Sequence, residues 1–174
     1  MSKQLDDIES QLKSMPEYIQ KAIREYTISV RVNKLLRGGF MPKQHIGRGF
    51  HKMAKYLDLA FSLIKPLDTD IIVYRGISNV DMFFKSDKGY TSTTTEKWYA
   101  ESFVGKSKCC LLVIRVPKGS HVLRIPASLG AYGEENEILL FRGGTYALSE
   151  KQIEKESNKI CLLYTSDAAD DTPC

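Results

Sequence analysis

The spacing of apolar residues changes at Pro66, and this change most restricts the folds that the chain can adopt. Before Pro66, apolar residues recur every three or four positions over residues 3–37 and 50–64, which is the period of amphipathic helices. After it come short runs rich in β-branched and aromatic residues, which are typical of strands. The candidate strands are residues 71–74, 89–94, 111–116, 121–125, 138–142, 145–148 and 159–163. Helices first and short strands afterwards predict an α+β fold.

Proline, glycine and capping residues predict where the helices begin and end. Pro16 is expected to start a second N-terminal helix with Ser14 as its N-cap, and Gly38 with Gly39 is expected to close it. The glycines and proline of residues 39–49 indicate a loop. A short helix is also expected over residues 96–103, among the strands.

Length and composition are those of a single soluble domain. The chain has 174 residues and a formal net charge of +4. No apolar run is long enough to cross a bilayer, and the polar N-terminus lacks the apolar stretch of a signal peptide. The three histidines and four cysteines show neither the spacing of a metal site nor that of a disulfide framework. We therefore expect a protein made in soluble form, with no membrane partner and no metal.

The C-terminal residues 161–174 resemble the conceptual translation of a sequencing adapter. We therefore expect one domain over residues 1–160, followed by a non-native tail; a genuine polar tail is the alternative. The tail carries three Asp and no Lys or Arg, so the rest of the chain is more basic than its total charge indicates. A basic surface suits an anionic cofactor or an acidic partner. We expect no nucleic-acid partner, because no basic run with interleaved aromatic residues occurs.

Three short motifs place charged and hydroxyl residues beside candidate strands. They are Val-Tyr-Arg-Gly at residues 73–76, Gly-Tyr-Thr-Ser-Thr-Thr at 89–94 and Gly-Glu-Glu-Asn-Glu-Ile-Leu-Leu at 133–140. If Glu135 and Glu137 lie in a strand, their side chains point to the same face. Neighbouring carboxylates repel, and different surroundings drive their pKa values apart, as in catalytic pairs. Taken alone, the pair is explained as well by a solvated strand end.

The order and spacing of the three motifs resemble the arginine–serine–glutamate class of mono-ADP-ribosyltransferases, of the bacterial toxin and exoenzyme type. The resemblance extends from about residue 26 to residue 146. It implies two small antiparallel sheets packed across each other, with NAD in the cleft between them. It also implies an activity, the transfer of ADP-ribose from NAD to an arginine of a target protein with release of nicotinamide.

The resemblance implies three catalytic residues. Glu137 would stabilise the positive charge that develops on the ribose as nicotinamide leaves. Ser92 would hold the Glu137 carboxylate by a hydrogen bond. Glu135 would pair with the incoming guanidinium and take its proton, because a protonated guanidinium is a poor nucleophile.

The resemblance also implies an NAD site and a recognition site. The NAD-binding residues would be Arg75, Gly76, Ser92, Thr93, Phe103, Lys106, Asn33 and Arg37. Three positions depart from many relatives, with Lys106 where an Arg is usual, Gly76 where a second Arg is common, and Ser29 where some carry a Tyr. Core packing is the alternative role for Phe103. Tyr132, on the loop before the glutamates (the ARTT loop of the family), would recognise the target protein together with Glu135.

Two other functions remain open at this point. The chain can be an NAD glycohydrolase, in which water replaces the arginine, or a catalytically silent protein-binding module of the same fold. The intact Arg75, Ser92, Glu135 and Glu137 disfavour the silent module. The family type implies a monomer that leaves its cell by a non-classical route, is delivered into a host cell or is carried by a phage.

Overall fold

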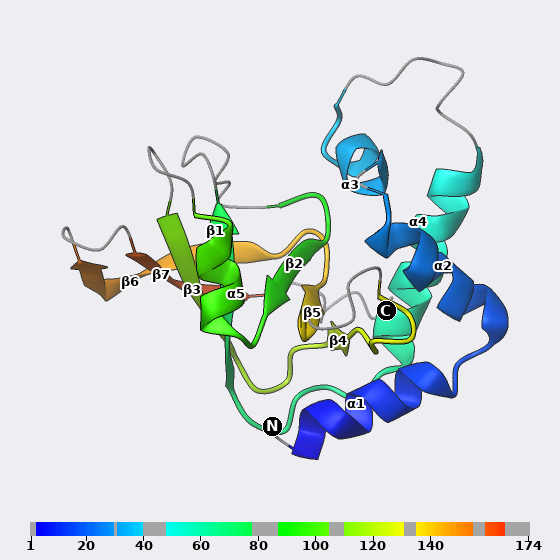
Figure 1. Cartoon of the computed structure of the whole chain (residues 1–174), viewed down its shortest axis with the longest axis horizontal. Coiled ribbons are helices and arrows are strands. Elements are labelled where there is room, and N and C mark those ends of the chain that lie inside the picture. Colours follow the sequence, from blue (N-terminus) through cyan, green and yellow to red (C-terminus); the bar gives the residue numbers. More distant parts are fainter. Residues whose placement is uncertain are drawn as a thin grey trace, which may run out of the picture.

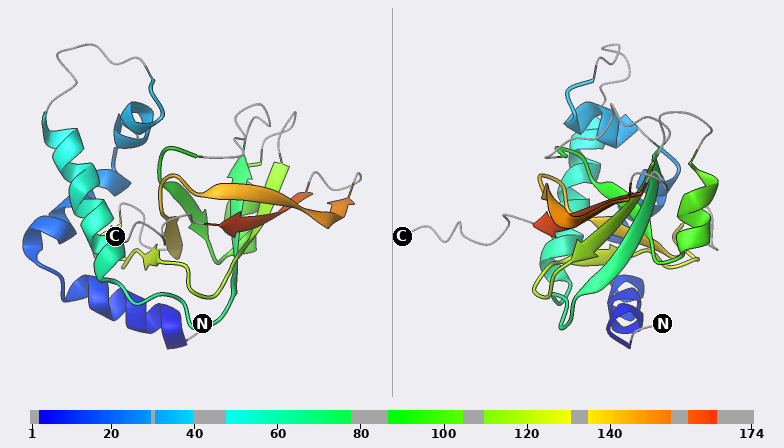
Figure 2. Two further views of the ribbon diagram at one scale, coloured as in Figure 1. Left: turned by 180° about the vertical axis from the view of Figure 1, so that it is seen from behind. Right: turned by 90° about the vertical axis from the view of Figure 1, so that its left-hand side faces the viewer.

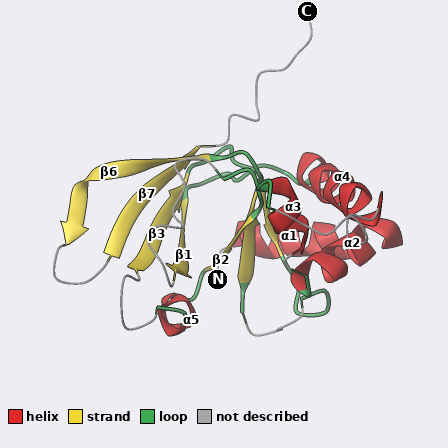
Figure 3. Cartoon of the chain, turned by 90° about the horizontal axis from the view of Figure 1, so that it is seen from above, coloured by secondary structure: helices red, strands yellow, loops and turns green. Residues whose placement is uncertain are grey.

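Four helices gather at one end of a set of strands, and a fifth, short helix packs against the strands themselves (Figure 1). The computed structural model describes residues 3–29, 31–39, 48–77, 87–104, 110–130, 135–154 and 159–165. Figure 3 shows the helical group and the fan of strands side by side, which agrees with the predicted α+β class. No helix within these ranges is long and apolar enough to cross a membrane.

The helices follow the predicted apolar spacing, but the second predicted helix ends at Thr27, and a separate short helix lies between it and Gly38. They are α1 (Lys3–Lys13), α2 (Glu17–Thr27), α3 (Arg31–Leu36), α4 (Arg48–Leu63) and α5 (Lys97–Ser102). In α2, the buried residues Ile19, Ala22, Ile23 and Tyr26 form one face, as helical periodicity requires. The prediction that Ser14 caps α2 is wrong. Pro16 is the N-cap, and the Ser14 hydroxyl instead donates to the carbonyl of Gln11, 2.8 Å away, at the end of α1.

The strands form two groups that meet at a short connection. They are β1 (Ile71–Ile77), β2 (Thr91–Thr94), β3 (Cys110–Val116), β4 (Val122–Arg124), β5 (Glu137–Leu140), β6 (Thr145–Glu154) and β7 (Lys159–Thr165), in the order β4-β5-β2-β1-β3-β7-β6. β1 pairs with β3 along all seven of its residues, but its register with β2 is the pair Tyr74↔Thr94. The resemblance implied two sheets, but hydrogen bonds between β1 and β2 join the two groups of strands into one sheet. It also implied antiparallel strands throughout, whereas β3 and β7 run parallel.

Strand β7 agrees with the candidate strand at residues 159–163 and includes the first residues of the expected tail. It lies between β3 and β6, and its paired residues include Cys161 to Thr165. The adapter-like composition therefore does not keep residues 161–165 out of the sheet. The rest of the tail, residues 166–174, lies outside the described residues, and its non-native origin stays a prediction.

Buried contacts join the helices to the strands that carry the motifs. The Arg124 side chain of β4 is 4% exposed, and its guanidinium pairs with Asp6 at 2.5 Å and with Glu9 at 3.2 Å, both on α1. Tyr90, just before β2, is fully buried and donates its hydroxyl to Asp58 of α4 at 2.6 Å. These contacts set β2 and β4 against the helical group, and Figure 2 shows this junction from two further sides.

Candidate active site

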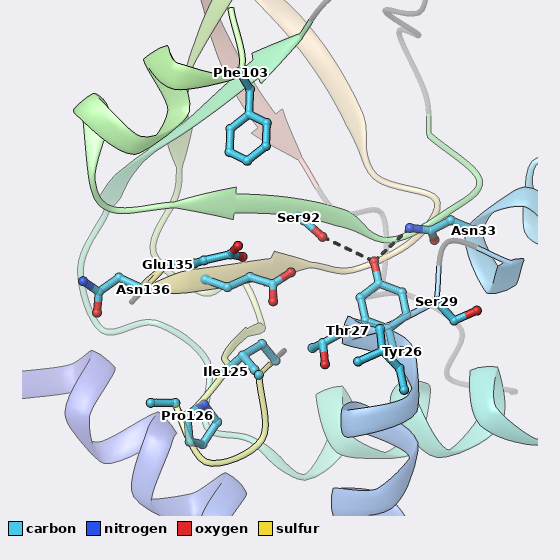
Figure 4. A pocket seen from close by; sticks show the side chains of 14 residues that line it. Tyr26, Thr27, Ser29, Asn33, Ser92, Phe103, Ile125, Pro126, Glu135 and Asn136 are labelled. Carbon is cyan, nitrogen blue, oxygen red and sulfur yellow. Dashed lines mark hydrogen bonds between the residues drawn. The ribbon is translucent and has the colours of Figure 1, made fainter. Parts of the chain in front are cut away.

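Two adjoining cavities lie where the three motifs meet. The larger, of about 420 Å³, extends from the end of α2 and the loop after β4 to β2 and β5. The smaller, of about 210 Å³, lies between β1, β2 and α5. Both are lined by Ser92, Phe103, Glu135 and Glu137, so we treat them as one cleft. Figure 4 shows the Phe103 ring reaching toward Ser92 from one side and Tyr26 from the other.

Arg75 lies on β1 at the edge of the smaller cavity. Its Nη1 donates a hydrogen bond of 2.7 Å to the backbone carbonyl of Ser92. The Arg75 guanidinium therefore holds β2 and also lines the cleft. From this position its remaining donors can reach phosphate or ribose oxygens of a ligand.

Gly76 allows α5 to lie against β1. A Cβ at this position would be 2.0 Å from the Ala100 carbonyl oxygen and 2.9 Å from Cβ of Phe103. A larger residue would thus push away the helix end that carries Phe103 into the cleft. This packing explains the glycine, and its predicted contact with the cofactor stays a prediction.

The three residues of the serine–threonine motif have separate tasks. Ser92 is half-buried and lines both cavities. The Thr93 hydroxyl donates to the carbonyl of Ile138 at 2.6 Å, which fastens β2 to β5. The Thr94 hydroxyl donates to the carbonyl of Glu135, also at 2.6 Å. Both threonines therefore support the glutamate motif from the neighbouring strand.

The backbone between the two glutamates is not a strand. Asn136 has φ of 44°, in the left-handed region, and β5 begins only at Glu137. Asn is one of the few non-glycine residues that adopt this conformation readily. The prediction that Glu135 and Glu137 share a strand face at i and i+2 is therefore wrong, because the turn at Asn136 breaks the period of two.

Glu137 is the half-buried first residue of β5, opposite Thr94 of β2, and it lines both cavities. Burial raises the pKa of the Glu137 carboxyl above its ordinary value. The hydrogen bond with Ser92 opposes this shift, Glu135 adds to it as a nearby like charge, and Arg75 opposes it as a cation. Glu137 is thus a desolvated carboxylate that shares the cleft with Ser92 and has a cation nearby, and the predicted task of Ser92 in holding it stays a prediction.

Glu135 is held from the opposite side, by α5 and the segment before it. The Tyr99 hydroxyl donates a hydrogen bond to Oε1 of Glu135. The neighbouring Asn136 amide donates to Oε1 of Glu96 at 3.4 Å. Glu135 therefore depends on α5 for its position, whereas Glu137 depends on β2.

Tyr26, where the resemblance begins, is a cleft residue to which the sequence analysis gave no role in the site. Its hydroxyl lies 3.5 Å from Oγ of Ser92 and accepts a 2.8 Å hydrogen bond from Nδ2 of Asn33 (Figure 4). Burial raises the pKa of Tyr26 to about 12, so the hydroxyl stays neutral at physiological pH. In the sequence, the indication of a role for Tyr26 was its position seven residues, or about two helical turns, before Asn33. The same position also fits the apolar face of α2. Tyr26 thus brings an aromatic side chain to the cleft, whereas position 29 carries a serine.

Asn33 and Arg37, both predicted to bind NAD, differ in their placement. Asn33 lines the larger cavity, and its amide exchanges hydrogen bonds with the backbone of Tyr90 at 2.8 and 3.0 Å. Arg37 lines neither cavity. It forms a bidentate ion pair with Asp87 at 2.6 and 2.8 Å. Gly89 makes room for both, since a Cβ there would lie 2.8 Å from Oδ1 of Asn33.

Phe103 is 55% exposed, so core packing does not explain it. It follows directly after α5, lines both cavities and makes an edge contact with the ring of Tyr99 at 5.3 Å between centroids. The two remaining predicted residues, Lys106 and Tyr132, lie outside the described residues. Within the described ranges, no group of three or more His, Cys, Asp and Glu side chains is arranged to hold a metal ion.

Comparisons with known proteins agree with this arrangement. The family model for ADP-ribosyltransferase exoenzymes matches residues 78–169, more than half of the chain. No match was found among curated proteins. Among solved structures, Plx2a, an ADP-ribosyltransferase toxin from Paenibacillus larvae, is 21% identical with a TM-score of 0.71, and 93% of each chain is covered.

Two further similar structures were solved with small molecules. C3stau2 from S. aureus, solved with NAD, is 19% identical with a TM-score of 0.72, covering 94% of this chain and 93% of that one. The ADP-ribosyltransferase Vis from Vibrio splendidus, solved with agmatine, is 18% identical with a TM-score of 0.62, covering 97% and 88%. At these identities the structures support the fold. Because the family model matches over half of the chain, and Arg75, Ser92 and Glu137 meet in one cleft, this protein belongs to the ADP-ribosyltransferase exoenzyme family, in its arginine–serine–glutamate toxin class.

Proposed function

We propose that this protein is an NAD-dependent mono-ADP-ribosyltransferase that modifies an arginine of a target protein and releases nicotinamide. The observation that carries the proposal is the separate support of the two glutamates. Glu137 is half-buried and desolvated in the cleft with Ser92 and Arg75, whereas Glu135 hydrogen-bonds Tyr99 of α5 in the same cleft. Two carboxylates with different surroundings suit two different tasks.

The side chains of the cleft suit NAD as the substrate. Arg75 offers a planar fork of donors for phosphate or ribose oxygens. The exposed ring of Phe103 offers a flat face for nicotinamide. Asn33 and Ser92 add polar groups along the larger cavity. The similar protein C3stau2 was solved with NAD, which supports the same ligand here.

Glu137 is placed to promote the first half of the reaction. As the bond between nicotinamide and the ribose C1′ breaks, its electron pair leaves with nicotinamide and positive charge develops on the ribose. A fixed carboxylate stabilises this charge most when water is excluded, because no solvent reorganisation is then needed. The partial desolvation of the half-buried Glu137 carboxylate favours this effect.

Glu135 is placed to promote the second half. A guanidino nitrogen of the acceptor forms a new bond to C1′ and must lose a proton, because a guanidinium is fully protonated at neutral pH. The Glu135 carboxylate pairs with the cation and accepts that proton. The similar protein Vis was solved with agmatine, a guanidino compound, which supports this class of acceptor.

Replacing Arg75 with Lys should weaken NAD binding on the order of 10-fold, because a lysine lacks the planar fork and cannot reproduce charge-assisted hydrogen bonds at two atoms. Titration of NAD into the variant measures this effect. Arg115→Lys is the matched control, because Arg115 lies on the adjacent strand β3 and pairs with Asp70 outside the cleft. An unchanged affinity in Arg75→Lys would remove Arg75 from the NAD site.

The rate of nicotinamide release should fall as the pH is lowered through the raised pKa of Glu137, because only its ionised form stabilises the ribose cation. The acidic limb of kcat/KM should therefore lie at higher pH than an ordinary glutamate would give. Glu135→Gln removes a neighbouring negative charge and should move this limb to lower pH. A limb that does not move would show that the two carboxylates do not interact.

Incubation of the protein with labelled NAD and a cell lysate tests the function as a whole. We expect one or a few labelled protein bands, with the label on an arginine identified by mass spectrometry. Release of nicotinamide without any labelled protein would instead indicate a glycohydrolase. Absence of both label and release would indicate a silent binding module.

A further inference from the structure

We propose that Tyr99 is a positioning residue that holds Glu135 in place for the acceptor guanidinium and thereby determines the balance between transfer and hydrolysis. This inference rests on the proposed function, because it concerns how the acceptor is used. Its basis is the hydrogen bond from the Tyr99 hydroxyl to Oε1 of Glu135, at the rim of the smaller cavity.

The helix that carries Tyr99 is fixed to the same backbone as the glutamate it contacts. The Thr94 hydroxyl donates to the carbonyl of Glu135 at 2.6 Å and accepts the backbone N–H of Glu96 at 3.0 Å. Glu96 is the N-cap of α5, and Ala100 of α5 is 2% exposed, where it packs beside Gly76. Thr94, at the end of β2, therefore holds both the backbone of Glu135 and the start of the helix that carries Tyr99.

The ring of Tyr99 is oriented independently of its hydroxyl. It makes edge contacts with Trp98 at 5.6 Å and with Phe103 at 5.3 Å between ring centroids. Edge-to-face aromatic pairs favour a defined ring geometry. Removal of the hydroxyl alone should thus leave the ring, and with it α5, in place.

The contact leaves Glu135 able to do its proposed chemistry. Tyr99 occupies Oε1, and the carboxylate keeps further lone pairs for a guanidinium. In the transfer step the bond from C1′ to nicotinamide breaks, a bond from C1′ to the guanidino nitrogen forms, and the guanidino proton passes to Glu135. Tyr99 keeps its own proton throughout. A carboxylate that is already held in one rotamer loses less conformational entropy when the acceptor binds. The transfer of ADP-ribose to the acceptor is therefore faster.

Tyr99→Phe is the variant that isolates the hydroxyl. With NAD and agmatine, labelling of agmatine should fall on the order of 10-fold, as expected for a lost hydrogen bond to a charged group. Nicotinamide release without acceptor should stay within about 2-fold of the wild type, because Glu137 is held by Ser92 and not by α5. A merely structural role would lower both rates together, and that result would overturn the proposal, as would unchanged labelling.

Trp98→Phe is the matched control, since Trp98 is 61% exposed on the same helix, contacts the Tyr99 ring and lies outside the cleft lining. It should leave both rates unchanged. In a double-mutant cycle, Tyr99→Phe should cause no further loss of labelling when Glu135 is already Gln. Additive losses would contradict a pathway from Tyr99 through Glu135.

A second variant keeps the test decisive if Tyr99→Phe does not fold. Glu135→Asp retains a carboxylate but shortens it by one methylene, so that it no longer reaches the Tyr99 hydroxyl. Labelling should again fall while hydrolysis persists, and wild-type labelling in Glu135→Asp would overturn the inference. Failure of the proposed function is recognised separately, because in that case Glu135→Gln itself would keep its full labelling of agmatine.

Discussion

Glu137→Gln is expected to abolish both nicotinamide release and ADP-ribose transfer. The ribose cation would lose the desolvated carboxylate of the cleft, and removal of a preorganised electrostatic group costs on the order of 10²–10³-fold in rate. NAD should still bind, because Arg75 and Phe103 remain in place. Steady-state release of nicotinamide and an NAD titration measure the two effects separately.

The same variant should fold normally and be at least as stable at neutral pH. Because burial raises the pKa of Glu137, the folded protein binds this proton more tightly than the unfolded chain. The stabilising contribution is present at low pH and is lost as the pH rises through the folded pKa, so a neutral amide avoids a cost at pH 7. Glu101→Gln is the control, since Glu101 is an exposed residue of α5 that pairs with Lys97. Near-normal turnover in Glu137→Gln would contradict the assignment.

Glu135→Gln is expected to lose transfer but retain hydrolysis. A glutamine cannot accept the guanidino proton, and loss of a general base lowers the rate on the order of 10²-fold or more. Bond breaking at the ribose still has Glu137, so nicotinamide release without acceptor should remain within about 10-fold of the wild type. The measurement is agmatine labelling and nicotinamide release in parallel reactions.

Retention of labelling in Glu135→Gln would show that arginine is not the acceptor. Loss of both rates, as in Glu137→Gln, would show instead that the two carboxylates act as one unit. Only a loss confined to transfer fits the structure, in which Glu135 hydrogen-bonds Tyr99 on α5 and Glu137 interacts with Ser92 on β2.

The fold class was predictable because periodicity is a local property of the chain. The face of α2 that carries Ile19 and Ile23 is visible as a spacing, and the burial agrees with it. A strand was expected at residues 159–163, but its pairing with β3 was not predictable, because no local pattern records which distant strand a segment will join.

That Arg75, Ser92 and Glu137 would lie together was predictable, but the geometry of the site was not. Motif order indicated that Arg75, Ser92 and Glu137 would meet, and the cleft brings them together. The left-handed turn at Asn136 was missed, because Glu-x-Glu reads equally as a strand and as a turn. Tyr26 was missed, because an aromatic residue on an apolar helix face is indistinguishable by spacing from a core residue.

Long-range polar partners were the least predictable part. Arg37 pairs with Asp87, which is fifty positions away in the chain, and this ion pair directs the guanidinium away from the cavity linings. Burial would raise the pKa of Asp87. The hydrogen bonds from Arg37 and from the Gly89 N–H outweigh this effect, so the pKa of Asp87 is lowered. Such a pair depends on how α3 meets the segment before β2, which no sequence spacing encodes.

The stoichiometry of the wild-type reaction tests the central claim most directly. In one reaction with NAD and saturating agmatine, released nicotinamide and ADP-ribosylated agmatine are both counted by mass spectrometry. We predict that nearly every nicotinamide released is matched by one modified agmatine, and that this match disappears in Glu135→Gln. Release of nicotinamide with only free ADP-ribose as the second product would contradict transfer to arginine and identify the protein as a glycohydrolase.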